Sequence, residues 1–161
     1  MPDVPAARAA DLLAARVLAA AGLPYVLHEH APVLGAADHA LSGLDLHSSM
    51  KTLSFVLADD SVVLVGIPGP AKLSYGALAR ALGVPRSQVR GAPPQVIEAL
   101  GMQPGGVCPF TSEPGVQVVL DQAVLDMPVI YCGSGRPDVT VEVTPDVLLR
   151  ACPAAEVADL G

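Results

Sequence analysis

Lys51 is the first residue whose type and position suggest chemistry. The segment "KTLSFVL" alternates, with Leu53, Phe55 and Leu57 on one parity, and Lys51 shares that parity. Because successive side chains of a strand point to opposite faces, Lys51 is aimed towards the apolar face of a predicted strand. Its ammonium group could there meet a phosphate or a carbonyl group in a cleft. The alternative is that its aliphatic stem packs on apolar neighbours while the ammonium group stays in water.

Two glycine-containing segments could present backbone N–H groups to a ligand. The segment "QPGGVCPF" (103–110) combines two glycines with an X-Pro step, which predicts an irregular loop that can approach a ligand closely. The segment "CGSGRPD" (132–138) follows a predicted strand and could line a small pocket for an anion or a carbonyl group. Neither contains the G-x-x-x-x-G-K pattern of a phosphate loop. Each could equally be a plain connection between elements.

The other candidate ligands and nucleophiles lack a supporting context. His28 and His30 could share one face of a strand, but no third ligand is indicated and H-E-x-x-H is absent, so we predict no metal. No serine lies in a G-x-S-x-G segment. Cys108 has no nearby base in the sequence, and we expect a buried, inert thiol. Three cysteines without C-x-x-C indicate neither a disulfide framework nor a zinc site, and they fit a reducing cytoplasm.

Composition limits the class of protein. The 161 residues are 52% hydrophobic and 16% charged, which excludes a disordered chain and predicts one domain over residues 1–161. No run of about 18 apolar residues predicts a membrane span, and the alanine-rich N-terminus is interpreted as an amphipathic helix rather than a targeting peptide. The net charge of −7 disfavours nucleic-acid binding. Residues 51–90 carry +3, however, so either a small basic patch or ordinary solvated charges remain possible.

The elements that must position these residues follow from periodicity and from caps. An N-terminal helix is predicted to bury a stripe of Leu13, Val17, Ala20 and Ala21. Strands are predicted over 24–30, 52–57, 62–67, 116–120, 128–132 and 139–143, with a hairpin turn at Asp59–Asp60. Further helices are predicted over 36–41, 74–83, 93–100 and 144–152, with Ser74 and Thr144 as N-caps. Strands and helices do not strictly alternate, which favours an α+β fold with a mixed or antiparallel sheet.

The order of these segments resembles the YbaK/prolyl-tRNA synthetase-associated editing domain family. The resemblance runs from about residue 25 to 149 and is carried by "HEHAP", "KTL", "GGVCPF" and the glycine-rich part of "VIYCGSGRPDVTVEV". It implies a compact α+β domain with a mixed, partly barrel-like sheet and flanking helices, without metal or cofactor. It further implies hydrolysis of the ester between a wrong amino acid and a tRNA. The implied substrate is tRNA(Pro) carrying a small residue such as alanine or cysteine, and prolyl-tRNA synthetase is a possible partner.

The resemblance also implies roles for individual residues. It places Lys51 in the substrate cleft, near the terminal adenosine and the scissile ester. The residues expected to bind the substrate are His30, Thr52, Gly105, Gly106, Val107, Pro109, Gly133, Ser134, Gly135 and Thr140. Three features depart from the family: Gly-Ser-Gly replaces Ser-Gly-Gly at 133–135, Thr140 stands where an aspartate is usual, and Cys108 replaces a small hydroxyl residue. Because these positions lie near the expected amino-acid pocket, cysteine specificity does not transfer directly, and the substrate or the activity could differ.

Two other functions fit the same residues. One is a non-catalytic module that binds a small amino acid, a nucleotide or a tRNA end, since a fold does not fix a function. The other is a hydrolase of different small acylated substrates. A binding module would release no amino acid from tRNA, whereas an editing enzyme would. A hydrolase of other substrates would be recognised by comparing its rates on aminoacyl-tRNA and on simple esters. The sequence leaves the oligomeric state open.

Overall fold

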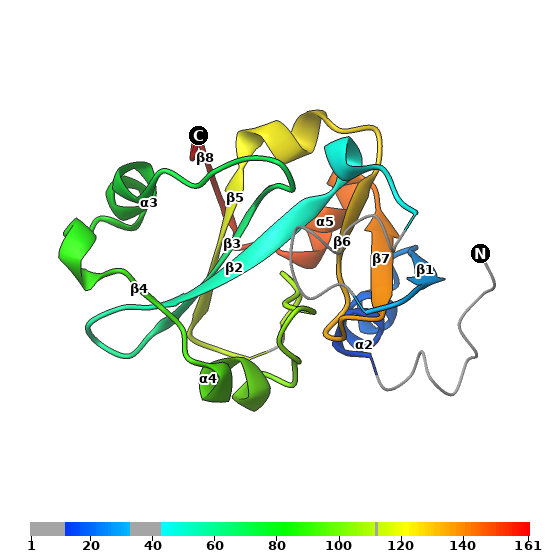
Figure 1. The fold of residues 1–161 in the computed structure, drawn as a ribbon, viewed down its shortest axis with the longest axis horizontal. Coiled ribbons are helices and arrows are strands. Elements are labelled where there is room, and N and C mark those ends of the chain that lie inside the picture. The colour runs from blue at the N-terminus through cyan, green and yellow to red at the C-terminus, as the bar shows by residue number, and fades with distance from the viewer. Residues whose placement is uncertain (1–11, 33–42, 112) are drawn as a thin grey trace.

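The strands form two sheets that meet along one edge (Figure 1). The computed structural model describes residues 12–32, 43–111 and 113–161. The smaller sheet is antiparallel, in the order β1 (Val26–Glu29), β7 (Val139–Val143) and β6 (Ile130–Gly133). The larger has the order β4 (Arg90–Gly91), β2 (Met50–Val56), β3 (Val62–Pro68), β5 (Val116–Asp121) and β8 (Glu156–Ala158).

The larger sheet is mixed. The neighbours β4, β2 and β3 are antiparallel, whereas β3, β5 and β8 run parallel. A single parallel bridge between Ser49 and Tyr131 joins the start of β2 to β6 in the smaller sheet. The strands therefore wrap partly around a common interior, and the predicted α+β fold with a mixed, partly barrel-like sheet is confirmed.

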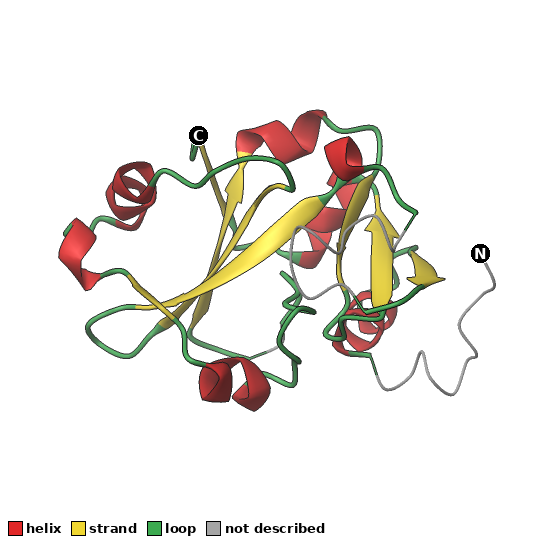
Figure 2. Cartoon of the chain, viewed as in Figure 1, coloured by secondary structure: helices red, strands yellow, loops and turns green. Residues whose placement is uncertain are grey.

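Helices lie on both sides of the strands (Figure 2). The α-helices are α2 (Leu13–Ala20), α3 (Tyr75–Leu82), α4 (Pro94–Ala99) and α5 (Pro145–Ala151), and the 3-10 helices are η2 (Leu46–Ser48), η3 (Arg86–Gln88) and η4 (Gln122–Asp126). Both predicted N-caps are confirmed, because the Ser74 hydroxyl accepts from the Ala77 N–H and the Thr144 hydroxyl from the Val147 N–H. Each cap satisfies a backbone donor that the first helical turn leaves without a partner.

Two apolar clusters occupy the two faces of the larger sheet. The first joins α2 and α5 to Leu64 and Leu120 of this sheet and to Val141 of the smaller one. The second lies under α3 and includes Phe55 and Ile67. Strand β3 contributes to both clusters, which confirms the prediction that a strand apolar on both parities is central and covered on each face.

Some local predictions need correction. The buried face of α2 consists of Leu13, Ala14, Ala15 and Leu18, so the predicted stripe that included Ala20 and Ala21 is wrong there. The helix ends at Ala20, and its inner side packs against strands from both sheets, which broadens the buried face. Strands β4 and β8 were not predicted, because two or three residues hold no detectable alternation. The helix predicted over 36–41 lies outside the described residues.

Candidate functional site

The smaller sheet has one apolar face and one polar face. Alternation along β1, β7 and β6 turns one set of side chains into the core, and these are Leu27, Ile130, Cys132, Val139, Val141 and Val143. Register pairs His28 with Thr140 and Tyr131 with Glu142, so these four side chains share the other face. All four are partly exposed. We define this surface, together with His30, as the polar face.

Two histidines of the polar face are fixed by side chains of β7. The His30 ring lies with Nε2 2.7 Å from Thr140 Oγ1 and Nδ1 2.7 Å from the carbonyl oxygen of Ala31. Since that carbonyl can only accept, Nδ1 carries a proton, and in the neutral ring the Thr140 hydroxyl donates to Nε2. The His28 Nε2 lies 2.9 Å from Glu142 Oε1, and its ring meets Tyr131 edge-on with centroids 5.8 Å apart. Predicted residues His30 and Thr140 are thus brought together.

Tyr131 keeps its proton on this face. Burial, followed by the negative charges of Glu142 and Asp45, raises the pKa of the Tyr131 hydroxyl. A neutral phenol can donate a hydrogen bond throughout the physiological pH range. His28, Tyr131 and Glu142 were not predicted as site residues. The signals for them were the H-x-H spacing of β1 and the position of Glu142 between buried valines of β7.

The two predicted glycine segments lie side by side. The Gly135 N–H donates to the Gly106 carbonyl at 2.8 Å, and the Gln103 N–H donates to the Gly135 carbonyl at 2.8 Å. A Cβ on Gly133 would overlap the carbonyl of Val107. A Cβ on Gly106 would approach the backbone of Arg136 within 2.6 Å. Only glycine permits this approach at either position.

The contact between the glycine segments lies beside the polar face. Gly133 is paired directly with Thr140, and paired residues direct their side chains to the same face of a sheet. The position where a Gly133 side chain would lie is occupied by the Val107 carbonyl, so Val107 lies on the same face as Thr140. Gly105 is exposed and Val107 is half-buried. Gly106 between them is buried, its N–H donates to the Gln103 carbonyl and its carbonyl accepts from the Gly135 N–H, so only backbone groups of Gly105 and Val107 could meet a ligand here.

Other predicted residues of these segments are enclosed. Ser134 is fully buried, and its hydroxyl donates to the Val139 carbonyl at 2.6 Å and accepts from the Arg136 N–H at 3.2 Å. Its own carbonyl accepts from the Ala14 N–H in the first turn of α2. Pro109 is buried, as is Gly135, whose φ of +105° favours glycine. The Ser134 hydroxyl therefore holds the loop in shape, and contact of this loop with a ligand would use backbone atoms.

Cys108 is enclosed in the first apolar cluster. Its side chain is fully buried, and its Sγ donates to the Phe110 carbonyl at 3.1 Å. Burial raises the pKa of the Cys108 thiol to about 12, and burial likewise raises the pKa of Cys132 and Cys152. All three cysteines are free. A buried thiol with a raised pKa is a poor nucleophile, in line with the inert thiol predicted for Cys108.

Lys51 lies at the beginning of β2, next to the polar face. It is paired with Ile67, a residue of the second apolar cluster, so the predicted parity with Phe55 is confirmed. The side chain of Lys51 is nevertheless exposed, and within the described residues its ammonium group forms no ion pair. Ser49 and Tyr131 are paired in the parallel bridge, and Lys51 and Gly133 follow them by two residues along the two strands. Because side chains alternate along a strand, Lys51 and Gly133 lie on the same side as the bridged pair. The lysine is thus adjacent to the glycine segments and free to meet an anion.

Thr52 is separated from Lys51 by the same alternation. Its side chain points to the opposite face of β2, and its Oγ1 is buried without a hydrogen-bond partner among the described residues. The structure therefore brings together Lys51, His30, Thr140 and the glycine segments, but not the side chain of Thr52. A part for Thr52 in binding stays a prediction.

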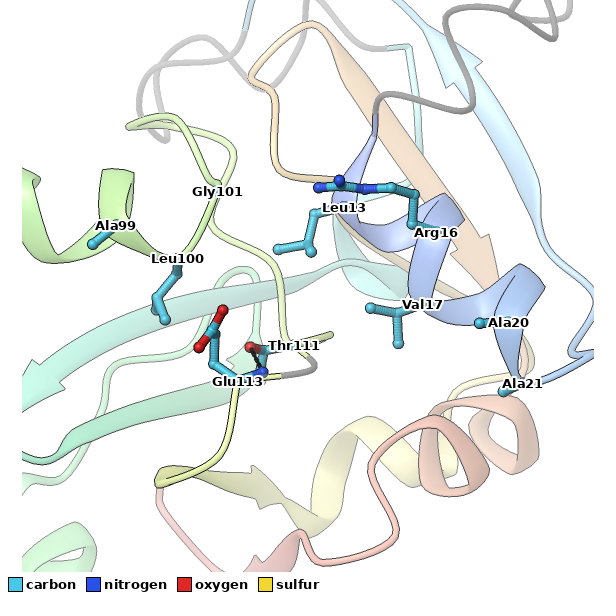
Figure 3. A pocket seen from close by; sticks show the side chains of 10 residues that line it. All are labelled: Leu13, Arg16, Val17, Ala20, Ala21, Ala99, Leu100, Gly101, Thr111 and Glu113. Carbon is cyan, nitrogen blue, oxygen red and sulfur yellow. Dashed lines mark hydrogen bonds between the residues drawn. The ribbon is translucent and has the colours of Figure 1, made fainter.

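A hollow of about 630 Å³ lies elsewhere, between α2 and the loop that follows α4 (Figure 3). Leu13, Val17, Ala20 and Ala21 line it, which is the stripe that the sequence pattern singled out. Arg16 and Glu113 supply charge on different walls. Since no predicted site residue lines this hollow, we place the candidate site on the polar face.

The described residues offer no obvious place for a metal. Across residues 12–32, 43–111 and 113–161, no three His, Cys, Asp or Glu side chains are grouped so that they could hold an ion. In the same part of the chain, no helix is long and apolar enough to cross a membrane. What the polar face can do is position a ligand through hydrogen bonds, a lysine charge and backbone amides.

These features define a class of protein, an α+β fold whose antiparallel smaller sheet carries a polar site, with a lysine of the neighbouring mixed sheet and paired glycine loops beside it. Residues 28–151 match the sequence profile of the family described as "Aminoacyl-tRNA editing domain". The chain belongs to the aminoacyl-tRNA editing domain family, as the order of its motifs indicated.

Individual relatives support this assignment. The chain is 29% identical over 106 residues to "Uncharacterized protein YwhH" of Bacillus subtilis (strain 168), and the match covers 66% of each chain, just under two thirds of that relative. The crystal structure of "hypothetical protein APE2540" superposes with a TM-score of 0.78 at 31% identity, covering 90% of this chain and 96% of that one. A structure of "a putative trans-editing enzyme for prolyl tRNA synthetase" gives 0.78 at 28% identity, covering 98% and 97%.

Proposed function

We propose that the protein is a free-standing deacylase that acts in the cytoplasm on tRNA(Pro) carrying a small non-cognate amino acid such as alanine or cysteine. The observation that carries this proposal is the convergence of Lys51, the His30–Thr140 pair and the backbone of 105–107 on one side of the sheet. Family membership supports an aminoacyl-tRNA as the substrate, and the solved structure described as "a putative trans-editing enzyme for prolyl tRNA synthetase" supports a link to prolyl-tRNA synthetase. Free cysteines support a reducing compartment.

The need for such an enzyme follows from binding energies. A synthetase pocket rejects a slightly smaller amino acid by only about 1–3 kcal/mol, so mischarged tRNA accumulates unless a second site hydrolyses it. An aminoacyl ester is already reactive. Its hydrolysis therefore requires mainly orientation of the ester and stabilisation of the charge that develops on its carbonyl oxygen.

In the proposed reaction a water molecule attacks the ester carbonyl carbon, and the C–O bond to the ribose breaks. The ribose oxygen leaves with a proton, and the amino acid is released. The Lys51 ammonium group binds the terminal phosphate or polarises the ester carbonyl. Backbone N–H groups of 105–107 and 133–135 hold the aminoacyl group, except those of Gly106 and Gly135, which already donate to Gln103 and Gly106. A neighbouring hydroxyl of the substrate can pass the proton of the attacking water to the leaving ribose oxygen, so no protein base is needed. Because water is the nucleophile, no protein nucleophile is needed either.

Thr140 gives the amino-acid pocket a neutral polar wall where relatives of this type carry an aspartate. Its hydroxyl already engages His30 at 2.7 Å, so this wall contributes a hydrogen bond rather than a full charge. We propose that His30 and Thr140 contact the amino acid, and that Pro109 and Ser134 support the loops that surround it.

The test is deacylation of tRNA(Pro) and tRNA(Ala) charged in turn with Ala, Cys, Ser, Pro and 2-aminobutyrate. The proposal expects release of a small amino acid from tRNA(Pro), with cognate prolyl-tRNA spared. A protein that shifts its melting temperature with these ligands but releases nothing is a binding module. Faster cleavage of simple aminoacyl esters than of any aminoacyl-tRNA points to a different hydrolase.

A further inference from the structure

Glu142 lies at the centre of the polar face. It belongs to β7, the middle strand of the smaller sheet, and register places it beside Tyr131 of β6 and Val26 of β1 (Figure 1). Its side chain is only 26% exposed, although it carries a carboxylate. Because a charged group that is partly removed from water needs partners, the groups around Glu142 have to be accounted for.

The carboxylate of Glu142 is bonded to His28. The His28 Nε2 lies 2.9 Å from Oε1, and since a carboxylate only accepts, this nitrogen carries the proton. Within residues 12–32, 43–111 and 113–161, no lysine or arginine pairs with Glu142, and its Oε2 forms no hydrogen bond. With a neutral His28 ring, the pair therefore carries a net negative charge that can meet a cation of a ligand.

The neighbours of Glu142 leave it as the acidic group of the sheet that faces the site. Burial, followed by the charges of Glu142 and Asp45, raises the pKa of Tyr131, so this residue adds an aromatic ring and no second charge. The Asp45 carboxylate is engaged differently, because it accepts from the His47 N–H at 3.0 Å in an exposed turn. A carboxylate beside an aromatic ring is a favourable environment for an ammonium group.

Glu142 and Lys51 lie at opposite corners of the candidate site. Lys51, Gly133 and Thr140 follow one line across the strands, because Gly133 is paired with Thr140 and follows the bridge as Lys51 does. Glu142 and its partner Tyr131 occupy the next line, two residues along β7 and β6. At about 3.3 Å per residue and 4.8 Å between strands, the Cα of Glu142 lies about 7 Å from that of Thr140 and roughly 12 Å or less from that of Lys51.

These opposite charges match the charges of an aminoacylated adenosine. From the terminal phosphate onwards, the substrate carries an anion, then the ester, then the α-ammonium cation. The proposed function places Lys51 at the phosphate or the ester and Thr140 at the amino acid. The ammonium nitrogen is roughly 2.5 Å from the ester carbon, and a charge-assisted hydrogen bond adds about 2.8 Å. An ester beside Gly133 and Thr140 can thus present its ammonium group to the next line, where Glu142 lies.

We propose that Glu142 binds the α-ammonium group of the aminoacyl ester and so restricts the enzyme to esters of free amino acids. This inference rests on the proposed function, because it takes the ester to lie between Lys51 and Thr140. An N-acylated aminoacyl-tRNA, such as a peptidyl-tRNA, has an uncharged amide nitrogen in this place. Its binding would leave the Glu142 carboxylate without the cation that it meets in the correct substrate, and an unpaired polar group in a site gives strong discrimination. The enzyme therefore spares the growing chains that share the cell with its substrate.

The test compares wild type with Glu142→Gln on alanyl-tRNA(Pro) and on lactyl-tRNA(Pro), in which a hydroxyl replaces the ammonium group. The substitution keeps the shape of the side chain and removes its charge. We expect kcat/KM to fall at least tenfold on the alanyl ester and less than twofold on the lactyl ester. Because variant and wild type are compared on the same ester, the different intrinsic reactivities of the two esters cancel. Wild type should also cleave N-acetylalanyl-tRNA(Pro) at least tenfold more slowly than alanyl-tRNA(Pro).

Glu156→Gln is the matched control, because it makes the same change at an exposed strand position on β8 of the larger sheet. It should alter neither ester more than twofold. An equal loss on both esters in Glu142→Gln would mean that the residue only maintains the structure, and no loss on the alanyl ester would mean that it makes no contact. Either result overturns the proposal. So does an equally large, alanyl-specific loss in Asp45→Asn, which would assign the selection to the general negative potential of this region.

Non-hydrolysable analogues separate the two proposals. Acceptor-stem minihelices that end in 3′-alanylamido- or 3′-lactylamido-3′-deoxyadenosine differ only in the ammonium group, and their binding can be followed by fluorescence anisotropy. Wild type should bind the alanyl form at least tenfold more tightly, and Glu142→Gln should bind both alike. If wild type shows this preference but deacylates nothing, the proposed function fails and the Glu142 contact stands. If wild type deacylates alanyl-tRNA but binds both analogues equally, the contact fails and the function stands.

Discussion

The His30 imidazole and the Thr140 hydroxyl are joined by a 2.7 Å hydrogen bond across the β1–β7 pair, although 110 residues separate them in the chain. The same ring donates from Nδ1 to its neighbouring carbonyl of Ala31 at 2.7 Å. Both ring nitrogens are therefore engaged, and the ring plane is fixed at the edge of the polar face. We therefore expect stability and activity to depend on the hydroxyl of Thr140 more than on the volume of its side chain.

Replacement of Thr140 by valine tests this dependence. The side chains have nearly the same shape, but valine cannot hydrogen-bond Nε2, so the ring loses one of its two constraints. We expect the free energy of unfolding to fall by about 1 kcal/mol, the usual net value of one hydrogen bond, and kcat/KM for alanyl-tRNA(Pro) to fall about tenfold. Urea unfolding and deacylation rates measure the two effects. Thr140→Ser retains the hydroxyl and should keep most of the activity; a serine variant as slow as the valine variant would show that the hydroxyl is not what matters.

Replacement of Lys51 by methionine should reduce activity without reducing stability. Its exposed side chain has no ion pair in the described residues, so Lys51→Met should change the free energy of unfolding by less than about 0.5 kcal/mol. If the ammonium group stabilises charge on the ester, the rate of deacylation should fall by roughly 10²-fold or more.

The control for Lys51→Met is Arg150→Met, which removes an exposed cation from α5 that pairs with Asp146 and not with a residue of the polar face. Single-turnover rates on alanyl-tRNA(Pro) should be unchanged in the control. Comparable rates for Lys51→Met and wild type across a panel of mischarged tRNAs would rule out the role proposed for Lys51.

Local patterns in the sequence were sufficient to predict the elements that carry the site. The parity of Lys51 and Phe55 predicted one face of β2, and the cap residues Ser74 and Thr144 predicted two helix starts, because each of these features depends on neighbours within a few residues. The turn at Asp59–Asp60 was likewise local: Asp60 has a φ of +66°, and Asp59 accepts from the Ser61 N–H at 3.0 Å.

Relationships between distant strands could not be obtained in this way. The His28–Glu142 pair depends on the register of β1 against β7, and its members are 114 residues apart. A shift of this register by one residue would turn Glu142 into the core, and a single sequence contains no local feature that fixes the register. Alternation along β2 already placed Thr52 opposite Lys51, but only the bridge between Ser49 and Tyr131 shows which face of β2 adjoins the polar face.

The contact between the glycine segments predicts a large effect from a single methyl group. In Gly133→Ala the new Cβ would overlap the carbonyl of Val107, a backbone atom that cannot rotate away. We expect a loss of about 2 kcal/mol or more in the free energy of unfolding, or separation of the two loops with a loss of deacylation.

Gly91→Ala is the matched control for this substitution, because a Cβ at Gly91 meets no heavy atom within 4 Å. Urea unfolding of the control should agree with wild type to within about 0.5 kcal/mol. If Gly133→Ala is as stable and as active as Gly91→Ala, the close approach of the loops does not shape the site.

The buried thiols predict a loss of stability in alkaline solution. Burial raises the pKa of Cys108 from 9.0 to about 12, so the folded chain holds this proton at a pH where the unfolded chain releases it. The unfolded state then binds fewer protons than the folded state, and the free energy of unfolding must fall as the pH rises above 9. For one such group the slope approaches about 1.4 kcal/mol per pH unit.

Urea unfolding of wild type and of Cys108→Ala between pH 8 and pH 10.5 isolates this contribution from those of tyrosine and lysine, which both proteins share. The variant should be less stable than wild type at pH 8, because a buried group has been removed, but its stability should fall less steeply above pH 9. The difference between the two proteins should therefore shrink as the pH rises. Parallel curves over this range would mean that Cys108 ionises as readily in the folded chain as in the unfolded one, contrary to its burial beside Phe110.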